Sequence, residues 1–215
     1  MTAYTDVMLD LETVGTAPGS GIIAIGAVAF APGMAERDWR NFEVPVISMT
    51  SCRQAGLTFD TATLDWWEKQ EPAARRVFEA AKTGGDHIAW ALTEFATEFF
   101  PSGAKLWGNG SDFDNVLLGC AYKACNILLP WKYYNSQCFR TMKVQHASTP
   151  EPAFQGTRHN ALADAQHQAR WLQSIWADLK DREAGNAEWK KAVKAALVDV
   201  SKPRVEYAPG NDDVL

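Results

Sequence analysis

Two acidic residues, Asp10 and Glu12, end an apolar run near the start of the chain. If that run forms a β-strand, both carboxylates point to the same face, about 7 Å apart along the strand. Two negative charges this close repel each other unless a cation lies between them, and Mg²⁺ and Mn²⁺ prefer carboxylate oxygens. The pair therefore indicates a divalent metal site, and the alternative is a strand end whose acids are simply solvated.

A second acidic stretch, with Asp112 and Asp114, lies in the turn between an expected strand at 105–107 and an expected helix at 113–124. An aspartate at such a turn can cap the helix by accepting hydrogen bonds from its first N–H groups. The two acids therefore compete for roles, because one of them can be no more than a cap. Phe113 lies between them, and its ring would anchor the start of the helix.

A third candidate site surrounds the start of a long helix that Asn160 can cap. Asp164 lies in the first turn of this helix, where a negative charge is favoured by the helix dipole even without a ligand. His159 lies just outside the helix, so an exposed loop histidine is the alternative to a functional one.

The elements that must position these residues follow from hydrophobic periodicity. Apolar stretches at 7–11, 21–30 and 39–44 are joined by links too short for a parallel crossover, so they predict an antiparallel three-stranded meander. Helical spacing predicts helices beginning at Asp60, Pro72 and Asp86, at 113–124, at 137–145, from Asn160, and at 186–200. This order predicts an α/β fold in which helices flank a central mixed sheet.

Composition indicates one domain with a full core, since 47% of the 215 residues are hydrophobic. We expect no signal peptide, no membrane span and no membrane partner, because the chain lacks a basic start followed by an apolar segment and has no apolar run of 18 residues. Four cysteines without C-x-x-C pairing are typical of free thiols in a cytoplasmic protein. A net charge of −5 argues against a protein held to nucleic acid by a general positive field, although local phosphate contacts remain open.

The three acidic sites resemble, in order, the motifs of the DEDDh branch of the DEDD superfamily of 3′–5′ exonucleases. The first motif is matched by Asp10-Leu11-Glu12-Thr13, the second by Asn109, Phe113, Asp114 and Leu118, and the third by His159, Asp164 and Ala165. The segments 59–67, 106–110 and 130–135 are similar to a phage and bacterial branch that includes exodeoxyribonuclease-VIII-like enzymes and a mycobacterial exoribonuclease. The likeness covers roughly residues 6–177.

The resemblance implies a ribonuclease-H-like fold with a mixed five-stranded sheet. It also implies that Asp10, Glu12, Asp114 and Asp164 bind two Mg²⁺ or Mn²⁺ ions and that His159 is the general base. The substrate would be the 3′ end of single-stranded DNA or RNA, and the product a nucleoside 5′-monophosphate. Substrate contacts are expected from Thr13, Val14, Gly15, Asn109 and Trp67.

Residues 1–182 are expected to form the exonuclease domain, 186–200 an appended helix, and 201–215 a flexible tail. Three alternatives remain open at this point. The first is DNA rather than RNA as the substrate. The second is a catalytically silent subunit of the same fold that binds nucleic acid or assembles with partners, against which the complete set of four acids and His159 argues. The third is a metal-dependent phosphatase acting on small nucleotides. A homodimer is one option for the oligomeric state.

Overall fold

The computed structural model describes residues 4–200, with side chains up to residue 195. The chain divides into two compact units, Met1–Trp176 and Ala177–Leu215. The first unit contains the sheet and all the candidate site residues. The tail expected over 201–215 lies outside the described residues.

The first unit is an α/β fold built on one mixed sheet, as predicted. Its strands are β1 (Asp6–Thr13), β2 (Ile22–Phe30), β3 (Arg40–Val44), β4 (Lys105–Gly108) and β5 (Ser136–Cys138). The order across the sheet is β3-β2-β1-β4-β5. Strands β1, β2 and β3 form the expected antiparallel meander, while β4 pairs in parallel with both β1 and β5. This five-stranded arrangement is that of a ribonuclease-H-like fold.

The helices follow the expected order with four differences. They are α1 (Met49–Gln54), α2 (Thr61–Glu68), α3 (Pro72–Thr83), α4 (Ile88–Glu94), α5 (Asp114–Ala124), α6 (Phe139–Gln145) and α7 (Ala161–Val200), with short 3₁₀ helices at Glu36–Asp38 and Tyr133–Asn135 and a π-helical turn at Phe95–Phe99. Helix α1 was not predicted. The helix expected to begin at Asp86 begins at Ile88, and its N-cap is His87. The expected helix at 137–145 is wrong at its start, because its first two residues belong to β5, a strand of three residues that is too short to show alternation. The expected break before residue 186 does not occur, because α7 is helical throughout its length.

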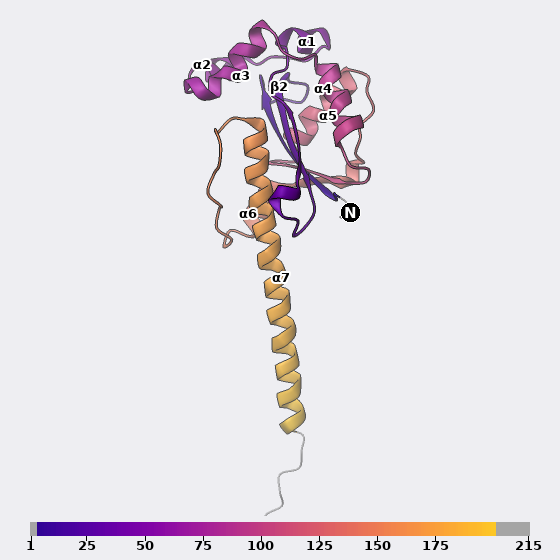
Figure 1. The fold of residues 1–215 in the computed structure, drawn as a ribbon, viewed down its shortest axis with the longest axis vertical. Helices are drawn as coiled ribbons and strands as arrows, with labels where there is room; N and C mark the ends of the chain where they lie inside the picture. The colour runs from indigo at the N-terminus through magenta and orange to yellow at the C-terminus, as the bar shows by residue number, and fades with distance from the viewer. Residues whose placement is uncertain (1–3, 201–215) are drawn as a thin grey trace, which may run out of the picture. The chain divides into compact units, whose positions relative to one another are not determined.

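One face of the sheet is closed by α4, the π-helical turn and α5 (Figure 1). Val7, Leu9 and Leu11 of β1 point to this side and are buried against residues such as Leu117 of α5. The alternation predicted for β1 is therefore present, since its apolar side chains enter the core. Asp10 and Glu12 consequently face the opposite side of the sheet.

The start of α7 covers that opposite face, and a glycine on β2 allows it to approach closely. Gly26 pairs with Asp10 in the antiparallel register. A side chain at Gly26 would overlap the backbone of Ala161 and Leu162, so only glycine leaves room for this helix end. The indole of Trp176 packs on Phe30 with ring centroids 5.8 Å apart, which fixes the helix farther along β2.

Within the described residues, no helix has both the length and the hydropathy that a membrane crossing requires.

Candidate active site

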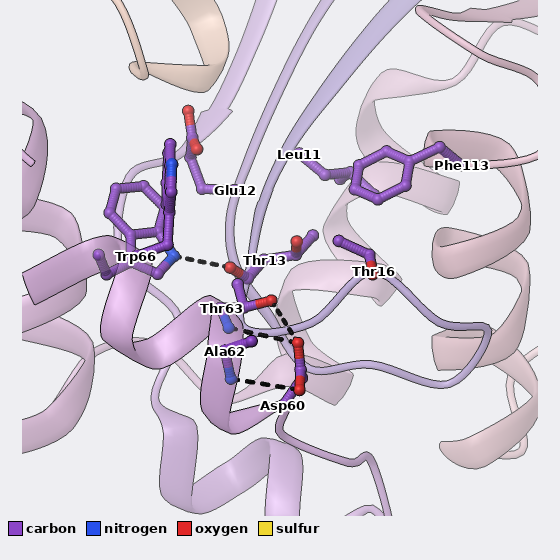
Figure 2. A pocket seen from close by; sticks show the side chains of 10 residues that line it. Leu11, Glu12, Thr13, Thr16, Asp60, Ala62, Thr63, Trp66 and Phe113 are labelled. Carbon is purple, nitrogen blue, oxygen red and sulfur yellow. Dashed lines mark hydrogen bonds between the residues drawn. The ribbon is translucent and has the colours of Figure 1, made fainter. Parts of the chain in front are cut away.

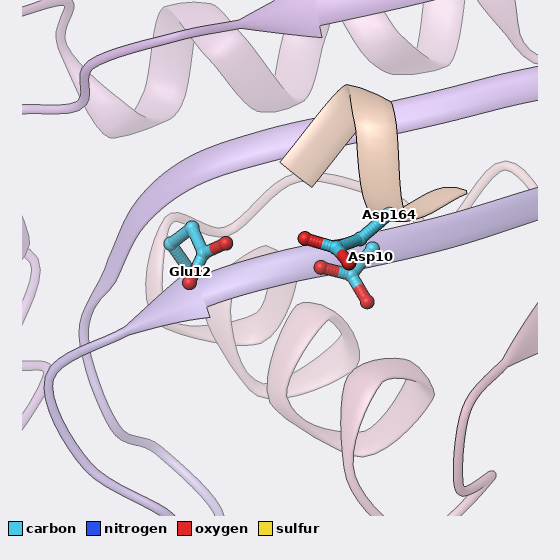
Figure 3. Close-up of side chains that lie close together, drawn as sticks. All are labelled: Asp10, Glu12 and Asp164. Atoms are coloured by element: carbon cyan, nitrogen blue, oxygen red, sulfur yellow. The ribbon is translucent and has the colours of Figure 1, made fainter. Parts of the chain in front are cut away.

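Three carboxylates from two distant parts of the chain meet where α7 begins. Asp10 and Glu12 come from β1, and Asp164 comes from the first turn of α7, whose start is capped by Asn160 through a 2.9 Å hydrogen bond from the Ala163 N–H. One carboxylate oxygen from each of the three acids lies within 4.8 Å of the others. Figure 3 shows the carboxylates of Asp10 and Asp164 facing each other, with Glu12 farther along the strand.

The fourth expected acid, Asp114, lies beside this group at the first position of α5. Its side chain is 3% exposed, and its Oδ2 accepts a 2.9 Å hydrogen bond from the backbone N–H of Asn109. A side chain at Gly108 would approach the Asp114 carboxylate to 3.1 Å, so this glycine makes room for it. Asp112 is exposed, and neither acid caps α5 through its side chain. Between the two acids, Asp114 is therefore the site residue, and Asn109 orients it through the backbone.

Gln168 was not identified from the sequence, although it belongs to the same site. It lies one helical turn after Asp164, on the same face of α7, and its Nε2 donates a 2.7 Å hydrogen bond to Asp10 Oδ1. The signal that could have found it is this spacing of four residues from Asp164.

The electrostatics of the site disfavour negative charge on all four acids. Burial raises the pKa of Asp10 well above its usual range, and the neighbouring carboxylates raise it further. Burial raises the pKa of Glu12 to about 8, with added repulsion from Asp164 and Asp114. Burial also raises the pKa of Asp114 to about 7 and raises that of Asp164. These buried and half-buried carboxyl groups therefore tend to hold protons that a bound cation would displace.

The donor set fits Mg²⁺ or Mn²⁺. All the candidate ligand atoms are carboxylate oxygens, which are hard donors, and no cysteine or histidine belongs to the group of three acids. Burial raises the pKa of all four acids, and repulsion from the other carboxylates raises it further at Asp10 and Glu12. A divalent cation among them would favour the ionised form of each. Asp10, Glu12 and Asp164 would hold the metal, with Asp114 next to them.

The raised pKa values predict that the metal-free protein loses stability as the pH rises. A carboxyl group whose pKa is higher in the folded chain than in the unfolded chain binds more protons when folded, so the free energy of unfolding falls as the pH increases. The window runs from about pH 4, where carboxyl groups of unfolded chains titrate, to about pH 8 for Glu12. We expect the Tm of the EDTA-treated protein to fall between pH 5 and pH 8.

Scanning calorimetry at these two pH values, with EDTA or with Mn²⁺, tests this prediction. Mn²⁺ should raise the Tm much more at pH 8 than at pH 5, because the cation competes with protons for the same oxygens. A Tm in EDTA that rises from pH 5 to pH 8 would contradict the pKa directions.

His159 lies at the edge of the acid group with its ring held by tryptophan. Its backbone has φ of +60°, a left-handed conformation that is unusual outside glycine. The ring meets Trp66 edge to face, with centroids 5.4 Å apart, and lies 6.4 Å from Trp67. The backbone of His159 makes a hydrogen bond with the carboxylate of Asp164. His159 is exposed, but its ring contacts Trp66 and its backbone is bonded to Asp164, so it is held beside the acid group.

A pocket of about 530 Å³ opens beside Glu12. Figure 2 shows Leu11 and Phe113 on one side of it, and Trp66 with Glu12 on the other. Asp60 lies at its base and caps α2 as the sequence predicted, accepting hydrogen bonds from the N–H groups of Ala62 and Thr63. Apolar walls next to a group of carboxylates suit a ligand with a flat ring and an attached polar group.

Two of the five expected substrate contacts, Val14 and Gly15, are buried and do not line the pocket. Trp67 lines the pocket together with Trp66, but it is 1% exposed and its indole N–H donates a 2.8 Å hydrogen bond to Thr13 O, so Trp66 offers the more accessible ring. Val14 is fully buried in an apolar cluster with Phe78. Gly15 is buried too, and a side chain there would collide with Ser20. Thr13 lines the pocket.

Comparison with known proteins gives one family match. The family model described as the 3′-5′ exoribonuclease Rv2179c-like domain matches residues 5–176. A search of curated proteins finds no match.

Proposed function

Because the chain belongs to the Rv2179c-like 3′-5′ exoribonuclease domain family, we propose that it is a metal-dependent exonuclease of the DEDDh type that removes nucleotides from the 3′ end of single-stranded RNA. The observation that carries the metal dependence is the convergence of Asp10, Glu12 and Asp164 within 4.8 Å. The family match extends over residues 5–176, nearly the whole first unit, which contains every residue that the chemistry needs.

The acids would hold two Mg²⁺ or Mn²⁺ ions, which when bound supply Lewis-acid activation of a water molecule and stabilise charge on the leaving 3′ oxygen. His159 takes the proton from the attacking water, since imidazole is suited to proton transfer near neutral pH. Its contacts with Trp66 and with the Asp164 carboxylate keep the ring at the edge of the acid group, where that proton is released.

The pocket beside Glu12 would receive the terminal nucleoside. Trp66 is 42% exposed, and its ring is available to stack on a base, which contributes about 1–3 kcal/mol per base in comparable sites. Phe113 would pack on the other side of the same nucleoside. These walls have no preference for one base, as expected of an enzyme that shortens a strand regardless of sequence.

Arg140, at the start of α6, is suited to meet a phosphate of the strand. Its guanidinium packs against Gly110, 3.2 Å from the place where a side chain would begin, and its positive charge acts on the Asp114 carboxylate. A cation at this edge of the acid group would draw a phosphodiester toward the metal ligands.

The test is to incubate the protein with 5′-labelled single-stranded RNA and DNA of one sequence, with Mg²⁺, Mn²⁺ or EDTA. We expect a ladder that shortens from the 3′ end, requires metal and forms faster on RNA. Asp114→Asn should abolish the ladder, whereas Asp112→Asn, a matched change at the exposed acid two positions earlier, should leave it intact.

Intact RNA and DNA under every metal condition would overturn the proposed activity. Hydrolysis of mononucleotides alone would replace it with the phosphatase alternative. Binding of RNA without cleavage, at an affinity that neither metal nor Asp114→Asn alters, would favour the silent binding subunit.

A further inference from the structure

The carboxamide of Gln168 is buried directly behind the acid group. The residue is 6% exposed, and its Nε2 lies 2.7 Å from Asp10 Oδ1. A terminal carboxylate rotates easily about its last bond, because that torsion has broad, shallow minima. A single short hydrogen bond from a fixed donor is therefore enough to decide how the two oxygens of Asp10 are presented. The bond engages one oxygen and leaves the other available to the cluster.

The second polar atom of this carboxamide is a separate observation. Gln168 Oε1 is buried and has no hydrogen-bond partner among the described residues. A buried acceptor without a donor costs about 1–3 kcal/mol, so such atoms mark places where a ligand or a water molecule completes the network. Asn109 Oδ1, beside Asp114, is in the same condition. Asn109 contacts Asp114 through its backbone N–H, so both residues with an unpartnered acceptor are bonded to an acid of the candidate site.

We propose that Gln168 is a positioning residue that holds the Asp10 carboxylate in the orientation that binds the metal. This inference rests on the proposed function, because it concerns the same metal site. In this role Gln168 acts on the metal through Asp10, the residue to which its carboxamide is bonded. Because Asp164 lies one turn earlier on α7, the two acids from distant parts of the chain are set by one helix: Asp164 directly, and Asp10 through Gln168.

The alternative is a purely structural role, in which Gln168 only packs in the interface between α7 and the sheet. The chain contains a matched example of that role in Gln173, on the same helix. Its Nε2 donates a 2.8 Å hydrogen bond to Ala31 O, and its Oε1 accepts one of the same length from the Gly33 N–H. Gln173 thus has both polar atoms engaged by a turn beyond β2, whereas Gln168 has one on a candidate metal ligand and one unpartnered.

The experiment compares Gln168→Met and Gln173→Met with the natural protein. Methionine has nearly the shape of glutamine but cannot donate a hydrogen bond. Mn²⁺ binding is measured by titration calorimetry, and RNA cleavage is measured over a range of Mn²⁺ concentrations. We expect Gln168→Met to bind Mn²⁺ ~10–100-fold more weakly, as losses of residues that orient metal ligands do. Gln173→Met should bind Mn²⁺ within about twofold of the natural protein, because its hydrogen bonds lie away from the acid group.

A second readout separates positioning from general damage. At saturating Mn²⁺ the cleavage rate of Gln168→Met should recover and the KM for RNA should be unchanged, since the substrate pocket is intact. A merely structural defect would not be repaired by more metal. Gln168→Asn serves as the second variant, because its shorter side chain keeps the amide but does not reach Asp10. Its Mn²⁺ affinity should be weakened as in Gln168→Met, and its cleavage rate should likewise recover at saturating Mn²⁺.

The outcomes distinguish this inference from the proposed function. If the natural protein binds Mn²⁺ and folded Gln168 variants bind it equally well, the positioning role is overturned and the metal-dependent activity stands. If the natural protein binds no Mn²⁺, both are overturned. If neither Gln168 variant folds while Gln173→Met does, Gln168 serves the fold rather than the metal, and the inference is overturned as well.

Discussion

Asp10→Asn is expected to reduce RNA cleavage at least about 1000-fold while making the metal-free protein more stable. The activity would fall because the central carboxylate of the proposed metal site is lost, and several kcal/mol of transition-state stabilisation would go with it. The stability rises because burial and three neighbouring acids raise the pKa of Asp10, so its charge is costly in the fold. Asparagine has the same shape without the charge and can still accept the Gln168 hydrogen bond.

The stabilisation should depend on pH. At pH 8 the free energy of unfolding should increase by roughly 1–3 kcal/mol, whereas below about pH 3 the gain should vanish, because the aspartate is then largely protonated in both states. Denaturant unfolding in EDTA at the two pH values measures this. Asp65→Asn, at an exposed acid on α2, is the control and should change neither stability nor cleavage. An Asp10→Asn protein that cleaves RNA normally would remove this residue from the site.

Gly26→Ala is expected to damage the site without touching any of its ligands. The added methyl group would overlap the backbone of Ala161 and Leu162, and backbone atoms cannot move aside as a side-chain tip can. We expect a loss near 3 kcal/mol, at the upper end for overpacking, or roughly 6–12 °C in Tm. If the fold survives by shifting the start of α7, Asp164 moves with it, and Mn²⁺ affinity and cleavage fall together.

Gly119→Ala is the matched control for this prediction. Gly119 lies within α5, where an added methyl group meets nothing within 4 Å. Replacing a glycine inside a helix should stabilise the protein by about 0.5–1 kcal/mol, because alanine loses less backbone freedom on folding. Thermal unfolding and Mn²⁺ titration of both variants measure the contrast. A Gly26→Ala protein as stable and as active as Gly119→Ala would show that α7 does not depend on this close approach.

The parts of the fold that the sequence predicted are those governed by local rules. Alternation in β1 fixed which of its side chains enter the core and put Asp10 and Glu12 on one face. Asp60 and Asn160 were predicted to cap helices, and the side-chain oxygen of each accepts a hydrogen bond from a backbone N–H group in the first turn. The three motifs also predicted the family, which the match over residues 5–176 supports at the level of a 3′-5′ exoribonuclease.

The parts that it missed depend on contacts between distant residues. Strand β5 exists because it pairs with β4, and three residues carry no pattern of their own. Two adjacent tryptophans line the pocket, and the sequence favoured Trp67 for substrate contact. Only the tertiary structure shows that the Trp67 ring is buried, with its indole N–H bonded to Thr13 O, and that Trp66 is the exposed one. The hydrogen bond from Gln168 to Asp10 could not be predicted, because it forms only when α7 packs across β1. The separate helix expected at 186–200 is instead the continuation of α7, because the apolar spacing of that segment does not show that it joins the preceding helix.

The site is complete only when both ends of a long stretch of chain have been made. Asp10 and Gln168 are 158 positions apart, and Asp164 and His159 also come late. At ordinary rates of translation, roughly 8–30 s separate the synthesis of Asp10 from that of Gln168. During that time the growing chain holds the acidic strand without the helix that closes over it. An unfinished chain emerging beside messenger RNA therefore carries no assembled acid group, and the proposed activity on RNA would begin only after the start of α7 has left the ribosome and packed against Gly26.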